Sequence, residues 1–188
     1  YVYADSIRDF EQSTSGSLPI IPNFAFQDLQ AGGYYSPSYI CLLDVDSTTD
    51  YLYLTTWRDS VDTTLVHIGT AVAEFNPALN NFQRVWARDH YEQDTIGDYI
   101  RGYSVEDFDG DGRKEFVLSF YLGNILVFEN AGDNSYQRVW RDSLPFTNLI
   151  YHSSGDVDGD GKPEFFLGAT MFNGNWTIVY EADSDGHY

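Results

Sequence analysis

Two short acidic segments of this chain share one pattern of aspartate, glycine and glutamate. The first is DFDGDGRKE, from Asp107 to Glu115, and the second is DVDGDGKPE, from Asp156 to Glu164. In each segment the aspartates alternate with other residues, and a glutamate follows them. Carboxylates this close together repel one another strongly unless a cation lies among them. Oxygen ligands on a flexible loop suit a hard ion, and Ca²⁺ is the ion that matches best.

The spacing within each segment predicts which groups bind the ion. The aspartates can direct their carboxylates at one point, the seventh residue can add its backbone carbonyl, and the final glutamate can complete the shell. Glycines at the fourth and sixth positions let the backbone turn with positive φ at little steric cost. The predicted ligands are Asp107, Asp109, Asp111, the carbonyl of Arg113 and Glu115 at the first site, and Asp156, Asp158, Asp160, the carbonyl of Lys162 and Glu164 at the second.

The EF-hand is the main alternative for an acidic loop, and the sequence argues against it. An EF-hand needs a glutamate at its twelfth position and a helix on each side. The twelfth positions here are Leu118 and Leu167, and strand-like apolar runs follow both segments. A pair of Asp-Gly hairpin turns without metal is a second alternative. Such turns need neither the additional aspartate nor the glutamate, so we favour calcium loops between strands.

A longer repeat surrounds the two acidic segments. The sequence FQRVW at 82–86 recurs as YQRVW at 136–140. Units of about 50 residues with four strands have the size of β-propeller blades. We therefore predict an all-β fold built of β-propeller blades, and regard a β-sandwich as the alternative that explains the repeat less well. The strands predicted for the middle unit are 99–106, 115–122, 124–130 and 136–142.

The repeat predicts a single β-propeller region over 1–188 with about three four-stranded blades. The expected blades are 2–89, which is degenerate and carries a long insertion at 7–37, then 90–142, and then 143–188, which lacks its last strand. A ring of blades needs about four to eight of them. We therefore expect the chain to be part of a larger propeller or to associate with other copies of itself.

The first blade contains a degenerate counterpart of the acidic loops. Asp44, Asp46 and Asp50 occupy the equivalent stretch, but the Gly-Asp-Gly core is missing. These residues alone supply too few ligands for a Ca²⁺ shell. We expect two calcium sites in the chain and poor or no binding at this third position.

Composition bounds the class of partner. The chain has 188 residues, of which 43% are hydrophobic, and a formal net charge of −19. Size and composition suit a globular fold. An acidic surface repels nucleic acid and anionic membrane, so neither is an expected partner. We find no apolar run of membrane-spanning length and expect no membrane insertion.

The sequence contains no strong catalytic pattern. His67, His90, His152 and His187 are scattered, and there is no Gly-x-Ser-x-Gly, phosphate-binding loop or His-Glu-x-x-His. The best-grouped carboxylates are already assigned to metal, and a full ligand set indicates a structural ion. We expect no enzymatic activity, with a polysaccharide lyase or glycosidase as the alternative.

The tryptophans are a further candidate for function. Exposed indoles can stack on sugar rings, but Trp86 and Trp140 occupy equivalent positions of the repeat. That register favours packing within each blade over ligand binding. We expect Trp57 and Trp176 to belong to the blade core as well.

The motif Asp-x-Asp-Gly-Asp-Gly-x-x-Glu followed by an apolar strand resembles the FG-GAP/VCBS repeat. That repeat builds the calcium-bearing blades of integrin α-subunit propellers and of many secreted bacterial proteins. The sequence ENAGDNSY at 129–136 and the pair Val139-Trp140 are similar to the bacterial VCBS variety. The resemblance covers most of the chain and is strongest over 82–188.

The resemblance implies a calcium-rigidified scaffold for adhesion, recognition or display. Such modules are usually extracellular, either secreted or at the cell surface, and bind a protein or glycan partner. A carbohydrate-binding or carbohydrate-cleaving propeller (a lectin or lyase) is one alternative function. A subunit that assembles into a filament or ring is another.

Overall fold

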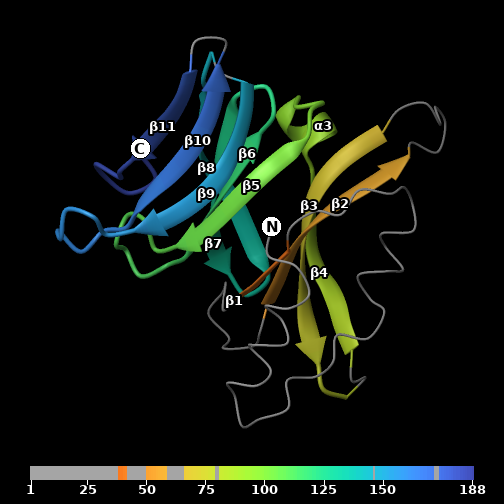
Figure 1. Ribbon diagram of the computed structural model, residues 1–188. Coiled ribbons are helices and arrows are strands. Elements are labelled where there is room, and N and C mark those ends of the chain that lie inside the picture. Colours follow the sequence, from red (N-terminus) through yellow and green to blue (C-terminus); the bar gives the residue numbers. More distant parts are fainter. Residues whose placement is uncertain (1–37, 42–49, 59–65, 79–80, 146, 172–173) are drawn as a thin grey trace, which may run out of the picture.

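The structure of the protein, a computed structural model, describes residues 38–41, 50–58, 66–78, 81–145, 147–171 and 174–188. Over these ranges the chain forms three antiparallel sheets with strand orders β1-β2-β3-β4, β5-β6-β7-β8 and β11-β10-β9 (Figure 1). The strands are β1 (Ser38–Cys41), β2 (Asp50–Arg58), β3 (Val66–Asn76), β4 (Asn81–Asp89), β5 (Ile100–Glu106), β6 (Glu115–Phe120), β7 (Asn124–Gly132), β8 (Ser135–Ser143), β9 (Thr147–Gly155), β10 (Glu164–Met171) and β11 (Gly174–Tyr180).

The all-β prediction is confirmed, because nearly all regular structure in the described ranges is antiparallel strand. The exception is the short helix α3 (His90–Asp94) between the first and second sheets. The three described sheets do not form a closed ring (Figure 1). The single region over 1–188 and the blade limits given above stay predictions. In the described part of the chain, no helix has the length and apolarity needed to cross a membrane.

The four strands predicted for the middle repeat are confirmed as β5 to β8, with small shifts at their ends. The largest shifts are two residues, in β6, which ends at Phe120 rather than at residue 122, and in β7, which ends at Gly132 rather than at residue 130. β6 ends early because of a turn. The chain turns there at Gly123, which has a φ of 94° and donates its N–H to Phe120 O at 3.1 Å. Glycine adopts this φ at little cost, so a tight turn that closes at Gly123 ends the strand at Phe120.

The middle sheet is buried on both faces, as its continuous apolar runs predict. Every residue of β6 is buried. Phe116 and Leu118 belong to a core that includes Leu52 and other residues of the first sheet, whereas Val117 belongs to a core that includes Phe165 of the third. The sheets are thus stacked face to face. The first acidic segment leads directly into β6, a strand that packs against the first sheet on one face and the third sheet on the other.

The expectation that Trp86 and Trp140 pack within their own blade needs correction, because their ring contacts reach the following sheet. Trp86 on β4 contacts the rings of Phe116, Phe128 and Tyr136, with centroids 5.3–6.0 Å apart. Trp140 on β8 contacts Tyr180 and Tyr188 at 5.2 and 5.5 Å. An indole is large enough to fill the space between two sheets, which explains its recurrence in the repeat. Trp176 is 51% exposed, and the side chain of Trp57 lies outside the described residues.

Helix α3 brings a buried ionic network to the joint between the first two sheets. Asp94 is buried and accepts hydrogen bonds from Arg88 Nε and Nη2, both at 2.8 Å, and from Arg138 Nη1. His90 lies between Asp94 and Thr70, at 2.8 Å from each. Burial opposes ionisation of Asp94, but the bonds from Arg88 and His90 outweigh it and hold its pKa well below the usual range. The network ties β3 and β4 to β8.

Candidate metal centres

Each acidic segment connects two antiparallel strands that pair within one sheet. The first lies between β5 and β6, where Glu106 pairs with Glu115, and the second lies between β9 and β10. In Figure 1 both loops lie at the same end of the molecule. Gly110 and Gly112 have φ values of 76° and 93°, in the region that other residues rarely adopt. These glycines let the loop fold its carboxylates inward.

In the first loop, backbone amides hold one oxygen of each of the predicted carboxylate ligands. The acceptor and donor pairs are Asp107 Oδ2 with Gly112 N (3.0 Å), Asp109 Oδ1 with Asp111 N (3.2 Å), Asp111 Oδ1 with Arg113 N (2.7 Å) and Glu115 Oε2 with Phe108 N (2.6 Å). These bonds fix the orientation of every carboxylate before any ligand arrives.

The second loop repeats these bonds one for one. The pairs are Asp156 Oδ2 with Gly161 N (3.0 Å), Asp158 Oδ1 with Asp160 N (3.0 Å), Asp160 Oδ1 with Lys162 N (2.8 Å) and Glu164 Oε2 with Val157 N (2.9 Å). Since the two loops have different neighbours, the shared geometry comes from their common sequence pattern.

The structure brings together all eight predicted carboxylate residues in two groups. In each group, one carboxylate oxygen from every member lies within 4.8 Å of the others. The first group is Asp107, Asp109, Asp111 and Glu115, and the second is Asp156, Asp158, Asp160 and Glu164. Each group can hold a metal ion. The ligand roles of the Arg113 and Lys162 carbonyls stay predictions.

Buried oxygen atoms show that these groups fit a cation. Glu115 is fully buried, and its Oε1 has no hydrogen-bond partner among the described residues. Oδ1 of Asp107 and Oε1 of Glu164 are also buried atoms without a hydrogen-bond partner among these residues. A buried carboxylate oxygen without a partner is costly, and a bound cation would supply the missing interaction. Oxygen-only donors of this kind match a hard divalent ion.

The electrostatics of the first loop point the same way. Burial, together with the nearby charges of Asp109, Asp107 and Asp111, raises the pKa of Glu115 to about 8. Without a cation, Glu115 therefore holds a proton at neutral pH. A divalent ion would displace this proton and offset the mutual repulsion of the carboxylates.

A third acidic group, Asp111, Glu129 and Asp185, was not predicted from sequence. The guanidinium of Arg113 already lies among these residues, forming ion pairs with Asp111 and Glu129 and approaching Asp185 at 3.7 Å. The single charge of Arg113 therefore offsets part of the negative charge of this group. A sequence signal existed for Glu129, because it pairs with Glu115 across β6 and β7, where two like charges need compensation.

The degenerate third loop is described only at its end. Asp44 and Asp46 lie outside the described residues. Asp50 is the first residue of β2 and is fully buried. It matches Glu115 and Glu164, which begin β6 and β10. The expectation of poor metal binding at this position stays a prediction.

Comparison with known families gives one result. A family model described as an FG-GAP-like repeat matches residues 107–167, from the first residue of the first acidic loop into β10. A search of curated proteins found no match. The matched segment includes both loops and all their carboxylate groups. Residues 107–167 are thus similar to an FG-GAP-like repeat, and the chain is consistent with an FG-GAP-like repeat protein of β-propeller type.

Proposed function

We propose that this chain is a calcium-stabilised structural or binding module. In it, one Ca²⁺ in each acidic loop holds a strand connection in fixed geometry. The proposal depends on one observation: in each loop the final glutamate has a buried oxygen without a hydrogen-bond partner among the described residues. These atoms are Oε1 of Glu115 and Oε1 of Glu164. Each glutamate is anchored to the loop backbone through Oε2, which leaves Oε1 for a cation. Calcium is favoured because it accepts many oxygen ligands in a flexible geometry.

The ion would act structurally in this proposal. When bound, it supplies positive charge and coordination to carboxylates that otherwise repel. The chain itself orients the carboxylates through backbone hydrogen bonds. It also joins the first loop to β6, a strand in which every residue is buried. Stable turns at one end of stacked sheets suit a scaffold for adhesion or for recognition of a protein or glycan. We propose no enzymatic activity.

An extracellular or cell-surface location follows from the same proposal. Loops that bind Ca²⁺ with modest affinity stay loaded where free calcium is high, which is outside cells. The net charge of −19 is compatible with such a calcium-dependent module, because bound ions neutralise part of it.

A melting experiment tests the proposed function. Because an ion that binds only the folded state stabilises it, millimolar Ca²⁺ should raise the melting temperature and a chelator should lower it. Replacing the oxygen ligands with isosteric amides, in Asp107→Asn with Asp111→Asn, should reduce the calcium response. A melting temperature unaffected by both chelator and calcium would contradict the proposal.

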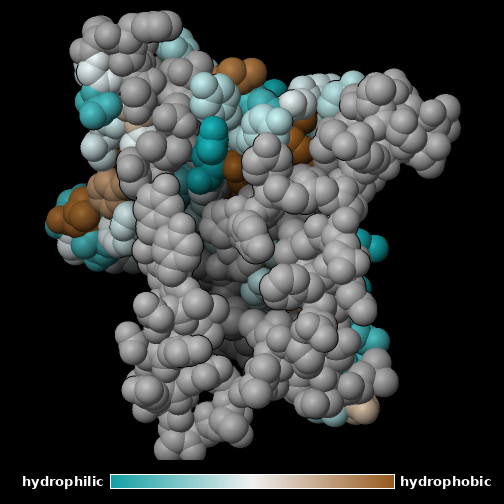
Figure 2. Space-filling view, turned by 45° about the vertical axis from the view of Figure 1, so that its right-hand side comes forward, coloured by the Kyte–Doolittle hydropathy of each residue, from teal (hydrophilic) through white to brown (hydrophobic). Residues whose placement is uncertain are grey.

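Glycan binding is a second candidate, favoured by exposed aromatic residues at the other end of β6. Tyr99 and Tyr121 are 58% and 36% exposed, and the Arg101 guanidinium carbon lies 4.9 Å from the Tyr121 ring centroid. Flat exposed rings are suited to stacking on sugars. On the face that Figure 2 shows, the coloured hydrophobic residues form separate areas. Glycan-array binding that is lost in Tyr99→Ala would support this function, and a blank array would remove it.

A further inference from the structure

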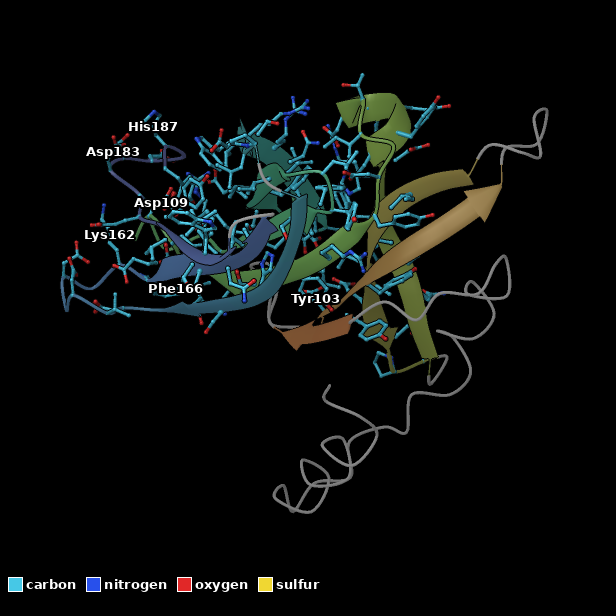
Figure 3. All side chains as sticks on the ribbon, turned by 45° about the horizontal axis from the view of Figure 1, so that its top comes forward. Tyr103, Asp109, Lys162, Phe166, Asp183 and His187 are labelled. Atoms are coloured by element: carbon cyan, nitrogen blue, oxygen red, sulfur yellow. The ribbon has the colours of Figure 1, made fainter. Side chains whose placement is uncertain are left out.

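Residues 181–188 fold into a compact turn after β11. Asp183 N–H donates to His187 O at 3.0 Å, and His187 N–H donates to Ser184 O at 3.0 Å. The Asp183 side chain also accepts from Ser184 Oγ at 3.0 Å and lies 2.7 Å from His187 Nδ1. Figure 3 shows Asp183 and His187 beside Asp109 of the first loop. The turn holds its own shape while lying next to a candidate metal centre of another sheet.

Gly186 connects this turn directly to the first loop. Its N–H donates to Asp109 Oδ2 at 2.9 Å, across 77 positions of the chain. Gly186 has a φ of 62°, and a Cβ at this position would lie 3.3 Å from Cβ of Val139 on β8. Conformation and space therefore both favour glycine here. The contact helps to bury Asp109, which is only 7% exposed.

Tyr188 packs beside the same loop. Its ring centroid lies 5.5 Å from those of Trp140 and Phe165, between the second and third sheets. Its hydroxyl is buried and has no hydrogen-bond partner among the described residues. Burial raises the pKa of the phenol, and the charges of Glu115 and Asp109 raise it further. The hydroxyl of Tyr188 therefore lies close enough to the carboxylates of the first loop for their charges to act on it.

We propose that residues 183–188 form a cap over the first loop, and that a cation bound in the loop holds the cap in place. The cap carries Asp185, which offers a carboxylate oxygen within 4.8 Å of oxygens of Asp111 and Glu129, so the carboxylates of an empty loop repel it. A bound cation removes this repulsion, while Arg113 attracts Asp185 at 3.7 Å. The first metal centre therefore couples the third sheet to the second. This inference rests on the proposed calcium binding.

Coupling of this kind is reciprocal, so the cap must also strengthen cation binding. Within the described residues, the second loop has no comparable cover, since Asp156, Asp158 and Asp160 are all exposed. The first centre should therefore bind Ca²⁺ more tightly and release it more slowly than the second. The internal hydrogen bonds do not explain this difference, because the two loops share four backbone bonds to their carboxylates and the second loop has one more, from Gly159 N–H to Asp156 Oδ1 at 2.6 Å. We therefore assign the difference to the cap.

The test uses the full chain with the second loop disabled by Asp158→Asn and Asp160→Asn, so that only the first centre is titrated. In this parent, Gly186→Ala should weaken Ca²⁺ affinity about tenfold, as expected for the loss of one hydrogen bond to a charged group. Gly132→Ala is the matched control, because Gly132 also has positive φ, 139°, but a Cβ there meets nothing within 4 Å. Its affinity should equal that of the parent.

Two further measurements keep the test decisive if Gly186→Ala folds poorly. Tyr188→Phe keeps the ring packing but removes the hydroxyl, and it should also weaken the first centre. Hydrogen exchange of the Gly186 and His187 amides should slow when Ca²⁺ is added to the parent. Unchanged exchange, together with equal affinities of Gly186→Ala, Tyr188→Phe and the parent, would overturn the cap while leaving calcium binding intact. A parent that binds no Ca²⁺ would overturn the proposed function and the cap with it.

Discussion

The two acidic loops have the same sequence pattern and share four backbone hydrogen bonds to their carboxylates, but they lie in different surroundings. Phe108 in the first loop is fully buried and packs on Phe165 at 5.4 Å, whereas its counterpart Val157 is 67% exposed. Asp109 is buried beneath Gly186, whereas Asp158 is exposed. The comparison teaches that the motif sets the donor groups and their orientation. The neighbouring sheet sets their burial, and therefore their electrostatics and expected affinity.

The largest contrast should come from truncating the second residue of each loop. Phe108→Ala removes a buried ring and should lower the free energy of unfolding by about 3–5 kcal/mol. Val157→Ala should change it by less than about 0.5 kcal/mol, because the side chain is exposed. Both variants keep the backbone N–H that binds the glutamate. Denaturant unfolding of the pair measures the difference, and equal losses would show that the loops are not differently packed.

Disabling the metal centres one at a time should give the next largest effect. If calcium exceeds the dissociation constant about a thousandfold at the first centre and about a hundredfold at the second, the ions contribute about 4 and 2.7 kcal/mol. Asp107→Asn with Asp111→Asn should therefore reduce calcium-dependent stabilisation more than Asp156→Asn with Asp160→Asn. Thermal melts with calcium and with chelator measure both. A larger loss from the second pair would reverse the proposed ranking.

The stability of the calcium-free protein should depend on pH through Glu115. The pKa of Glu115 is raised from 4.5 to about 8, so the folded state binds a proton more readily than the unfolded state. Stability should therefore fall as pH rises between these values, by up to about 1.4 kcal/mol per pH unit. Glu115→Gln should remove this dependence, and Glu164→Gln should keep it. Chelator-treated unfolding curves from pH 5 to 8 provide the measurement; a dependence that persists in Glu115→Gln would rule out Glu115 as its source.

The smallest contrast concerns the seventh residue of each loop. Arg113 forms ion pairs with Asp111 and with Glu129, which is 2% exposed, whereas Lys162 Nζ makes one contact of 3.4 Å with the Ala182 carbonyl. Arg113→Ala should cost about 1 kcal/mol, and Lys162→Ala should cost almost nothing. Both substitutions keep the backbone carbonyl predicted to bind the ion. Unfolding in chelator shows the effect of the side chains alone, and equal costs would mean that the arginine network contributes nothing.

Local features of this protein could be predicted from sequence, and features that join distant segments could not. The acidic loops and the strands β5 to β8 follow from residue types and spacing within a few positions. The contact between Gly186 and Asp109 spans 77 positions and depends on how two sheets stack. Trp86 and Trp140 show the intermediate case. Their recurrence indicated packing, but the partner sheet became clear only in three dimensions.

Helix α3 was not predicted from the sequence, and its length and contacts explain why. It is five residues long and has no extended apolar period to detect. Asp89 caps it by accepting from Tyr91 N–H at 2.9 Å, and its buried Asp94 is compensated by arginines from two different sheets. Arg88 is near Asp94 in the sequence, but Arg138 lies 44 positions away, and only the stacking of the sheets brings it to Asp94.

Calcium titration of the full chain by calorimetry tests the central claim most directly. The account predicts one ion for each acidic loop, with the tighter event lost in Asp107→Asn with Asp111→Asn and the weaker one lost in Asp156→Asn with Asp160→Asn. Absence of binding at millimolar Ca²⁺, or binding that survives both pairs of substitutions, would contradict it.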